Sequence, residues 1–312
     1  MNVIATLGSS SLITALSCSI FSFIASLIYL RTHTNPLLSL ARNSIIASAI
    51  LISFSLVVMA YALLSNDFSI AHVASVSSTN MEPWMKWASI YSGQSGSLLF
   101  WTWALSLFLA IFSLKTLPKI HWGAPHAIIV MALLLSAFLI PLIFFTSPFT
   151  ISSITPEDGR GLNPLLVDRG MLVHPPALLS GLVSTSIPFT LAIAALMSGR
   201  VDSAWIQHAK PWALLSFLIL SIGNFLGAWW AYTVLGWGGY WGWDPVENSA
   251  ILPLLPMAAF LHSQSVQLRR GIFKGWNLSL VLVAFALAVF GTFNVRSGLV
   301  ASVHSFAQSD IG

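Results

Sequence analysis

The amino-acid sequence predicts an all-α fold, a single polytopic membrane domain over residues 1–312 with about eight transmembrane helices and the N-terminus outside. Only 13 Lys and Arg and 9 Asp and Glu occur, 7% of the chain, whereas a soluble domain has roughly 25%. The mean hydropathy of +0.85 excludes a disordered chain, which needs low hydrophobicity. The apolar residues form runs of about 20, the length of a membrane helix, and they do not alternate as barrel strands do.

Four of the expected spans lie in the first half of the chain. They cover residues 10–30, 44–64, 97–114 and 126–147. The first is not a cleavable signal peptide, because no Lys or Arg precedes Arg31. Arg42 and Lys115 stand at the edges of the second and third spans, and His126 opens the fourth.

The other four expected spans cover residues 176–198, 212–234, 249–268 and 276–295. Pro175 and Pro176 open the fifth span, where prolines are tolerated because the first N–H groups of a helix have no partner within it. Arg269, Arg270 and Lys274 separate the last two spans. This is the only cluster of basic residues, so nucleic acid is not an expected partner, whereas membrane lipid is.

The orientation follows from the distribution of charge. Nine of the 13 Lys and Arg fall in the short loops of one side with one acid, and the other four fall on the opposite side with eight acids. Because positive residues favour cytoplasmic loops, both termini are expected outside. The longer segments at about 65–96, 148–175, 235–250 and 296–312 then face outward, and function is expected on that face.

The segment at 235–250 is rich in tryptophan and glycine. Five of the 13 Trp fall within 15 residues: Trp229, Trp230, Trp237, Trp241 and Trp243. An aromatic belt at the membrane interface explains a few such residues but not their alternation with glycine. Glycine lets a flat ligand approach the backbone, and indole rings offer it an apolar surface. We therefore expect Trp237, Trp241 and Trp243 to form a platform for a planar ligand.

Asp244 and Glu247 look catalytic but have a structural explanation. Asp244-Pro245-Val246-Glu247 reads as a capping box, with Asp244 as the N-cap, Pro245 as the first helical residue and Glu247 as its N3 partner. The two interpretations are compatible, because the cap would also fix the edge of the platform. No catalytic residue is assigned from the sequence.

Two outward segments carry histidines that can bracket this platform. His174 lies in segment 148–175, and His304 lies in segment 296–312. Each taken alone reads more simply as a surface or capping residue. Beside an aromatic platform for a flat ligand, two imidazoles suggest haem with axial His ligands to the iron.

Two further residues are candidates for binding haem. His262 lies within the seventh span, where an ionisable residue is a functional candidate; the alternative is an imidazole bonded to a neighbouring helix. Its use as an iron ligand would need a second histidine. Arg296 lies between the eighth span and His304, and arginine suits the carboxylates of haem propionates. Ordinary surface charge is the alternative for Arg296, as for Arg160 and Arg169.

At residues 237–248, Trp-Gly-Gly-Tyr-Trp-Gly-Trp-Asp-Pro-Val-Glu-Asn, the chain resembles the CcmF/NrfE family of cytochrome c haem lyases. The resemblance covers about residues 40–312. Its further motifs are Gly96-Ser-Leu-Leu-Phe-Trp, Gly161-Leu-Asn-Pro-Leu-Leu, Val173-His-Pro-Pro, Leu261-His-Ser, Gly291-Thr-Phe-Asn-Val-Arg-Ser-Gly and Ser302-Val-His-Ser-Phe-Ala.

The resemblance implies a function in cytochrome c maturation. A haem chaperone delivers haem to the Trp platform, His174 and His304 ligate the iron, and the thiols of an apocytochrome Cys-x-x-Cys-His segment add to the haem vinyl groups. A second, b-type haem is implied at His262. The implied partners also include a thiol-handling subunit, and the implied location is a bacterial inner membrane with a periplasmic active face, or alternatively the mitochondrial inner membrane.

Family members are about twice as long, so the chain is expected to be the N-terminal half or one part of a split protein. The ligand that would pair with His262 is then expected in the C-terminal half or a partner subunit, and the lyase would be incomplete without it. Two other functions stay open. One is a haem carrier or exporter that loads a chaperone without lyase activity, and the other is a haem-free membrane transporter.

Overall fold

The computed structural model describes residues 2–297 and 302, and the described part is all-helical apart from one isolated β-bridge between Ile70 and Ile151. The helices are α1 (Val3–Thr32), α2 (Asn35–Leu64), α3 (Ala71–Val76), α4 (Pro83–Ala88), α5 (Gln94–Lys115), α6 (Ala124–Phe144), α7 (His174–Ser184), α8 (Ser186–Met197), α9 (Ala204–Val234), α10 (Pro245–Ile251), α11 (Leu254–Arg270) and α12 (Lys274–Arg296). Four 3₁₀ turns join them: η1 (Ser89–Tyr91), η2 (Leu117–Lys119), η3 (Pro164–Leu166) and η4 (Arg169–Leu172).

The prediction of eight spans is confirmed. Within the described residues, eight helical segments are long and apolar enough to cross a membrane, and each overlaps one predicted run. Several extend further than hydropathy indicated; α2, for example, begins at Asn35 rather than at residue 44. The polar residues at its start continue the helix because Pro36 occupies its first turn, where a missing N–H costs no hydrogen bond.

Two of the spans are interrupted. The fifth divides into α7 and α8 at Thr185, and the seventh divides into α10 and α11 around Leu252 and Pro253. Proline has no N–H and clashes with the preceding turn, which breaks a continuous helix. Each of these two spans therefore consists of two helices, α7 with α8 and α10 with α11.

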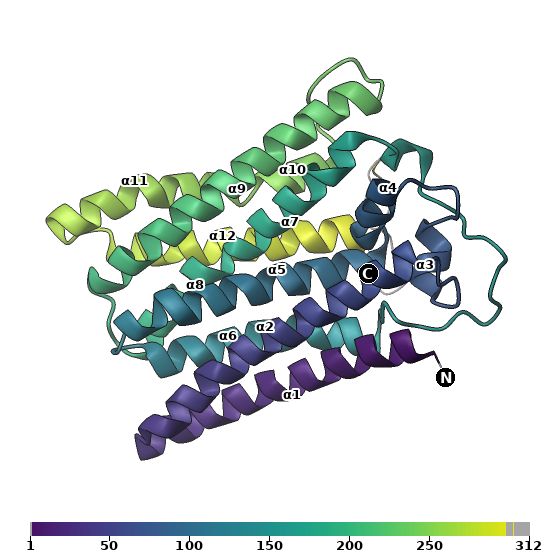
Figure 1. The fold of residues 1–312 in the computed structure, drawn as a ribbon. Coiled ribbons are helices and arrows are strands. Elements are labelled where there is room, and N and C mark those ends of the chain that lie inside the picture. The colour runs from purple at the N-terminus through teal and green to yellow at the C-terminus, as the bar shows by residue number, and fades with distance from the viewer. Residues whose placement is uncertain (1, 298–301, 303–312) are drawn as a thin grey trace.

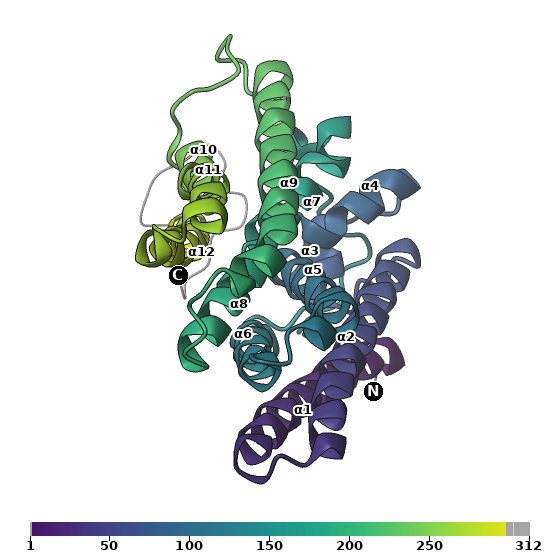
Figure 2. The ribbon, with the colours of Figure 1, turned by 90° about the vertical axis from the view of Figure 1, so that its left-hand side faces the viewer.

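The long helices run side by side and form one bundle (Figure 1). α1 and α2 lie at one edge of it, and α10, α11 and α12 lie at the opposite edge, beyond α9 (Figure 2). The short helices α3 and α4 gather at the end where α1 starts and α12 finishes (Figure 1). The start of α1 and the finish of α12 thus lie at the same end of the molecule, as an even number of spans requires.

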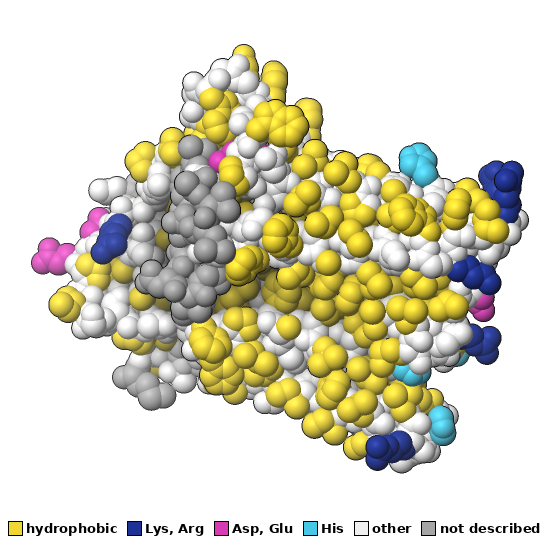
Figure 3. Space-filling model, turned by 180° about the vertical axis from the view of Figure 1, so that it is seen from behind, with side chains coloured by type: hydrophobic (Ala, Val, Ile, Leu, Met, Phe, Trp, Pro, Cys, Tyr) yellow, Lys and Arg dark blue, Asp and Glu magenta, His cyan; other side chains and the backbone are white. Residues whose placement is uncertain are grey.

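Charged side chains divide between the two ends. Figure 3 shows Lys and Arg gathered at one end of the bundle and most of the visible Asp and Glu at the other, with a hydrophobic band between them. This is the asymmetry from which the orientation was predicted. The positive-inside rule predicts that the end with the long segments faces outward, and below we use 'outer end' as a label for it.

His72, a residue to which the sequence assigned no role, packs between η1 and the start of α5 at the outer end. Its side chain is buried in α3, with Nε2 3.2 Å from the carbonyl oxygen of Ser89 and Nδ1 3.2 Å from Oγ of Ser95. Burial lowers the pKa of His72 to about 4. Gly96 makes this packing possible, because a Cβ there would lie 2.6 Å from the ring. A neutral imidazole therefore fixes the first turn of α5.

Candidate haem-binding site

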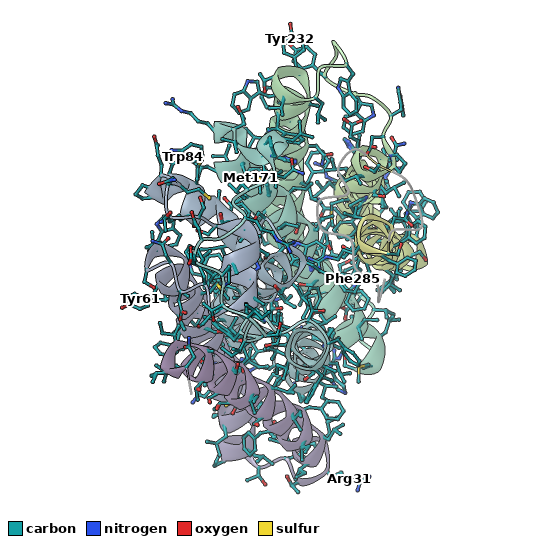
Figure 4. All side chains as sticks on the ribbon, turned by 90° about the vertical axis from the view of Figure 1, so that its right-hand side faces the viewer. Arg31, Tyr61, Trp84, Met171, Tyr232 and Phe285 are labelled. Carbon is teal, nitrogen blue, oxygen red and sulfur yellow. The ribbon has the colours of Figure 1, made fainter. Side chains whose placement is uncertain are left out.

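A pocket of about 980 Å³, partly open to solvent, lies near the outer end of the bundle and is called here the main pocket. Its walls are mostly apolar and come from α5, α7, α9, α10, α12 and the 3₁₀ turns η1, η3 and η4. The lining side chains that carry polar groups are Tyr91, Ser92, Ser97, Trp101, His174, Trp230, Ser249, Thr292 and Arg296. Met171, another lining residue, lies towards the middle of the outer end (Figure 4).

His174 is the first residue of α7 and lines the main pocket. Its Nδ1 lies 2.9 Å from the carbonyl oxygen of Gly223 on α9. The ring lies parallel to the indole of Trp230, with an interplanar angle of 16° and 6.3 Å between centroids. The imidazole is therefore held from two sides by α9.

A second, smaller pocket of about 350 Å³ adjoins the first and is called the side pocket. It shares His174, Leu178, Val246 and Ala250 with the main pocket and adds Trp241 and Glu247. The structure therefore brings His174 and Trp241 to one surface. Trp237 and Trp243 line neither pocket.

The Trp loop, residues 235–244, has an irregular backbone that glycine makes possible. Gly236 and Gly238 have φ of 69° and 74°, and a Cβ at Gly242 would lie 3.0 Å from the ring of Trp237. Trp243 also has a positive φ of 56°, which is strained for a bulky residue. Its side chain is 78% exposed, and its ring meets Trp241 edge-on with 6.4 Å between centroids.

The predicted capping box is confirmed. Asp244 Oδ1 accepts a hydrogen bond from the N–H of Val246 at 2.9 Å, and Glu247 accepts one from the N–H of Asp244 at 3.2 Å. Glu247 also accepts from the N–H of Gly242 at 2.9 Å, and Asn248 Nδ2 donates to the carbonyl of Trp243 at 3.1 Å. The first turn of α10 thus holds the end of the Trp loop.

Ser302, near the C-terminus, also contacts this cap. Its hydroxyl donates to Oδ1 of Asp244 at 2.8 Å. His304, which was predicted as the second outer ligand, lies outside the described residues, so its assignment stays a prediction. Ser302, which contacts the N-terminus of α10, precedes His304 by two residues in the sequence.

Arg296 ends α12 and lines the main pocket with His174. Its Nη2 donates to Oγ of Ser97 and to the carbonyl of Gln94, and its guanidinium carbon lies 5.0 Å from the ring centroid of Trp101. In the part of the chain that the structure describes, no carboxylate pairs with it. A half-buried cation without a counter-ion favours an anionic ligand in this pocket.

His262 lies on α11, apart from both pockets. Its side chain is exposed, whereas Gln264 and Gln267 on the same helix are buried, and Gln267 accepts a hydrogen bond from Asn277 on α12 at 2.8 Å. The packed face of α11 thus leaves His262 on the outside of the described bundle. No described histidine was found to join it in a metal-binding cluster.

The residues that surround the predicted ligands had no role predicted from the sequence. Trp230 was counted among the clustered tryptophans without a role, and Ser97 and Trp101 stood in a motif without a function. Gly223 and Gly227 carried no predicted role of their own, although their Gly-x-x-x-Gly spacing is typical of close helix contacts in membranes. That spacing is the one feature of the sequence that indicates the close contact of α9 with a neighbouring helix.

The donor set fits haem. The mostly apolar main pocket presents one imidazole, one guanidinium and the indoles of Trp101 and Trp230, and the adjoining side pocket adds the indole of Trp241. Haem needs an axial donor for iron, an apolar bed for the ring and a cation for the propionates. The pocket contains a residue for each requirement.

Comparison with known proteins agrees with this chemistry. Residues 91–300 match a protein family described as cytochrome C assembly protein. The chain is 40% identical over 310 residues to the cytochrome c-type biogenesis protein CcmF of Pseudomonas aeruginosa, and it is 38% identical over 255 residues to NrfE of Haemophilus influenzae. These alignments cover 98% and 82% of this chain but 47% and 40% of the relatives.

A solved structure described as cytochrome c heme lyase CcmF has a similar fold. The TM-score is 0.84 at 32% sequence identity, and the match covers 96% of this chain and 48% of the other. The chain therefore spans about half the length of the relatives that it matches.

Proposed function

This chain belongs to the cytochrome c assembly protein family, and from that premise we propose that it holds haem at its outer end for covalent attachment to apocytochrome c. The observation that carries the proposal is the main pocket, a mostly apolar cavity that both His174 and Arg296 line. CcmF of Pseudomonas aeruginosa, to which the chain is 40% identical, is a cytochrome c-type biogenesis protein, and the described part of this chain has eight helices long and apolar enough to cross a membrane. Haem is the substrate in this proposal, and it enters from a chaperone.

His174 supplies the first iron ligand. Its Nδ1 faces the carbonyl of Gly223, which can only accept a hydrogen bond. Nδ1 therefore carries the ring proton, and Nε2 presents the lone pair that binds iron, as is usual for histidine ligands whose other nitrogen is hydrogen-bonded. His304 supplies the second ligand, supported by the contact of Ser302 with Asp244.

The haem ring lies against Trp241, and Trp237 and Trp243 extend the aromatic surface beyond the pocket. Trp241 shares the side pocket with His174, which supports its place next to the ring. Asp244 acts through the cap that it makes on α10 rather than through contact with iron. Arg296 neutralises a propionate, because its guanidinium faces the main pocket without a carboxylate partner among the described residues.

The covalent step joins each cysteine of an apocytochrome Cys-x-x-Cys-His segment to a haem vinyl group. The thiol sulfur bonds to one vinyl carbon and its proton goes to the other, so no oxidant is consumed. The chemistry belongs to haem and thiol, and the protein supplies position. The thiols must arrive reduced, which requires a thiol-handling subunit of the maturation system, and the iron must be reduced.

His262 is the proposed site of a second, b-type haem in the membrane. An exposed imidazole in a membrane span is costly unless another group covers it. The C-terminal half or a partner subunit would supply the second ligand. The active face is the outer one, which is periplasmic in a bacterial inner membrane; in the alternative location, the mitochondrial inner membrane, it is the face turned away from the matrix.

Co-expression of the full protein with apocytochrome and haem-loaded chaperone tests the lyase. We expect covalent haem on the cytochrome with the wild-type protein and its loss with His174→Ala. Loaded chaperone with no covalent haem, even for the wild type, would contradict the lyase and favour a haem carrier. Purified protein without Soret absorbance would contradict both and favour a haem-free transporter.

A further inference from the structure

Gly223 and Gly227 stand one helical turn apart on α9 and face the start of α7. A Cβ at Gly223 would lie 2.7 Å from Cα of Leu178, and a Cβ at Gly227 would lie 2.6 Å from Cε1 of His174. Carbon atoms that are not bonded prefer about 3.5–4.0 Å. Only glycine at these two positions therefore lets α9 approach α7 as closely as it does.

The close approach determines where the His174 ring lies. Gly227 leaves the space that the ring occupies, and the carbonyl of Gly223 then reaches Nδ1 at 2.9 Å. Trp230, three residues beyond Gly227, lies parallel to the ring. Three successive contacts from one helix thus fix the position, the rotation and the protonated nitrogen of a single imidazole.

We propose that Gly223 and Gly227 are positioning residues that aim Nε2 of His174 at the haem iron. This inference rests on the proposed function, in which His174 is an iron ligand. A methyl group at Gly227 has to displace the ring, because the neighbour that it meets is the imidazole itself. The displacement moves Nδ1 away from the Gly223 carbonyl and Nε2 away from the iron.

The test is Gly227→Ala in the full protein, purified with its haem. Residues that orient a metal ligand typically contribute 10- to 100-fold to metal affinity, so we expect about tenfold weaker haem retention. We also expect a fall in the fraction of six-coordinate, low-spin iron, measured by the Soret band and by electron paramagnetic resonance. Added imidazole should restore the low-spin spectrum, because it replaces the displaced ligand.

Gly181→Ala is the matched control. Gly181 packs at the same α7–α9 contact, where a Cβ would lie 2.9 Å from the backbone nitrogen of Leu220. This substitution should lower thermal stability without changing the iron spectrum. A purely structural role of Gly227 would instead make the two variants lose the low-spin signal equally, and that result would overturn the inference.

An unchanged spectrum in Gly227→Ala, together with its loss in His174→Ala, would also overturn the inference and leave the ligand assignment intact. If His174→Ala itself keeps the spectrum, the ligand assignment fails. Should Gly227→Ala fold poorly, nitrogen-15 NMR of the haem-free wild type still decides. We expect the His174 signals, assigned by their loss in His174→Ala, to show protonated Nδ1 and unprotonated Nε2; the reverse tautomer contradicts the inference.

Discussion

The wall of the main pocket and the Trp loop both carry tryptophans, but the structure holds them very differently. Trp101 and Trp230 in the wall are each 4% exposed, whereas Trp243 in the loop is 78% exposed. The wall combines turns of the long helices α5, α9 and α12 with the shorter α7 and α10. The first turn of α10 holds one end of the loop through hydrogen bonds, and Tyr240 within the loop stacks on Tyr232 of α9. We infer that the wall sets the position of the iron and propionates, and that the loop receives the ring.

The largest expected effect concerns the packing behind the wall, where His72 is buried and neutral. The pKa of His72, about 4, is below the ordinary value of about 6.5. Between these two pH values, His72 binds a proton in the unfolded chain but not in the folded protein. Stability should fall by about 3 kcal/mol as the pH decreases from about 6.5 to about 4, and it should not change from this cause above that range.

Thermal unfolding in detergent at a series of pH values measures this loss. His72→Gln removes the titrating group and should flatten the dependence over that pH range, whatever its stability at neutral pH. His33, an exposed residue at the end of α1, provides the control substitution. If the stability of His72→Gln depends on pH as strongly as that of the wild type, the assignment of this pH dependence to His72 is wrong.

Arg296→Gln removes the positive charge from the wall. A hydrogen bond to a charged group contributes about 1.5–3 kcal/mol, so haem should bind roughly 10- to 100-fold more weakly. Arg296→Lys keeps the charge but loses the paired donors and should show a smaller loss. Equal affinity of wild type and Arg296→Gln, measured by haem titration, would show that the guanidinium holds no propionate.

Glu247→Ala tests how the loop is fixed. Glu247 accepts hydrogen bonds from Gly242 and Asp244, and loss of a helix cap costs about 1 kcal/mol. We expect faster amide exchange at about residues 240–250, with no change in α7. Unchanged exchange in this segment would mean that the cap does not restrain the loop.

Within the loop, Trp241→Ala and Trp243→Ala test which indole contacts the haem ring, that of Trp241 beside the pocket or that of the exposed Trp243. Trp241 shares the side pocket with His174, and an aromatic contact is worth about 0.5–1.5 kcal/mol beyond its buried area. We expect several-fold weaker haem retention for Trp241→Ala and a smaller change for Trp243→Ala. The opposite order would indicate that the haem ring lies against the exposed Trp243 rather than against Trp241 in the side pocket.

The same contrast shows what the sequence could predict. Hydropathy and charge located all eight spans, because a lipid environment demands long apolar runs. The capping box was readable because its contacts lie within four residues of one another. The Trp loop was recognisable because its composition is unusual over a short stretch.

The wall was not predictable, because it combines residues that are far apart in sequence. Ser97, Trp101, His174 and Arg296 meet only after α5, α7 and α12 have packed. His174 and Arg296 were each proposed as binding residues, but nothing in the sequence joined them to one pocket. The exposed position of His262 likewise depends on which face of α11 packs against α12.

The most direct test of the account is the iron spectrum of the full protein with and without His174. The account predicts that the wild type shows six-coordinate, low-spin haem and that His174→Ala loses one nitrogen ligand, with free imidazole restoring the spectrum. An outer haem with an unchanged low-spin spectrum in His174→Ala would contradict it, because the pocket would then hold iron by a residue other than the one around which its wall is built.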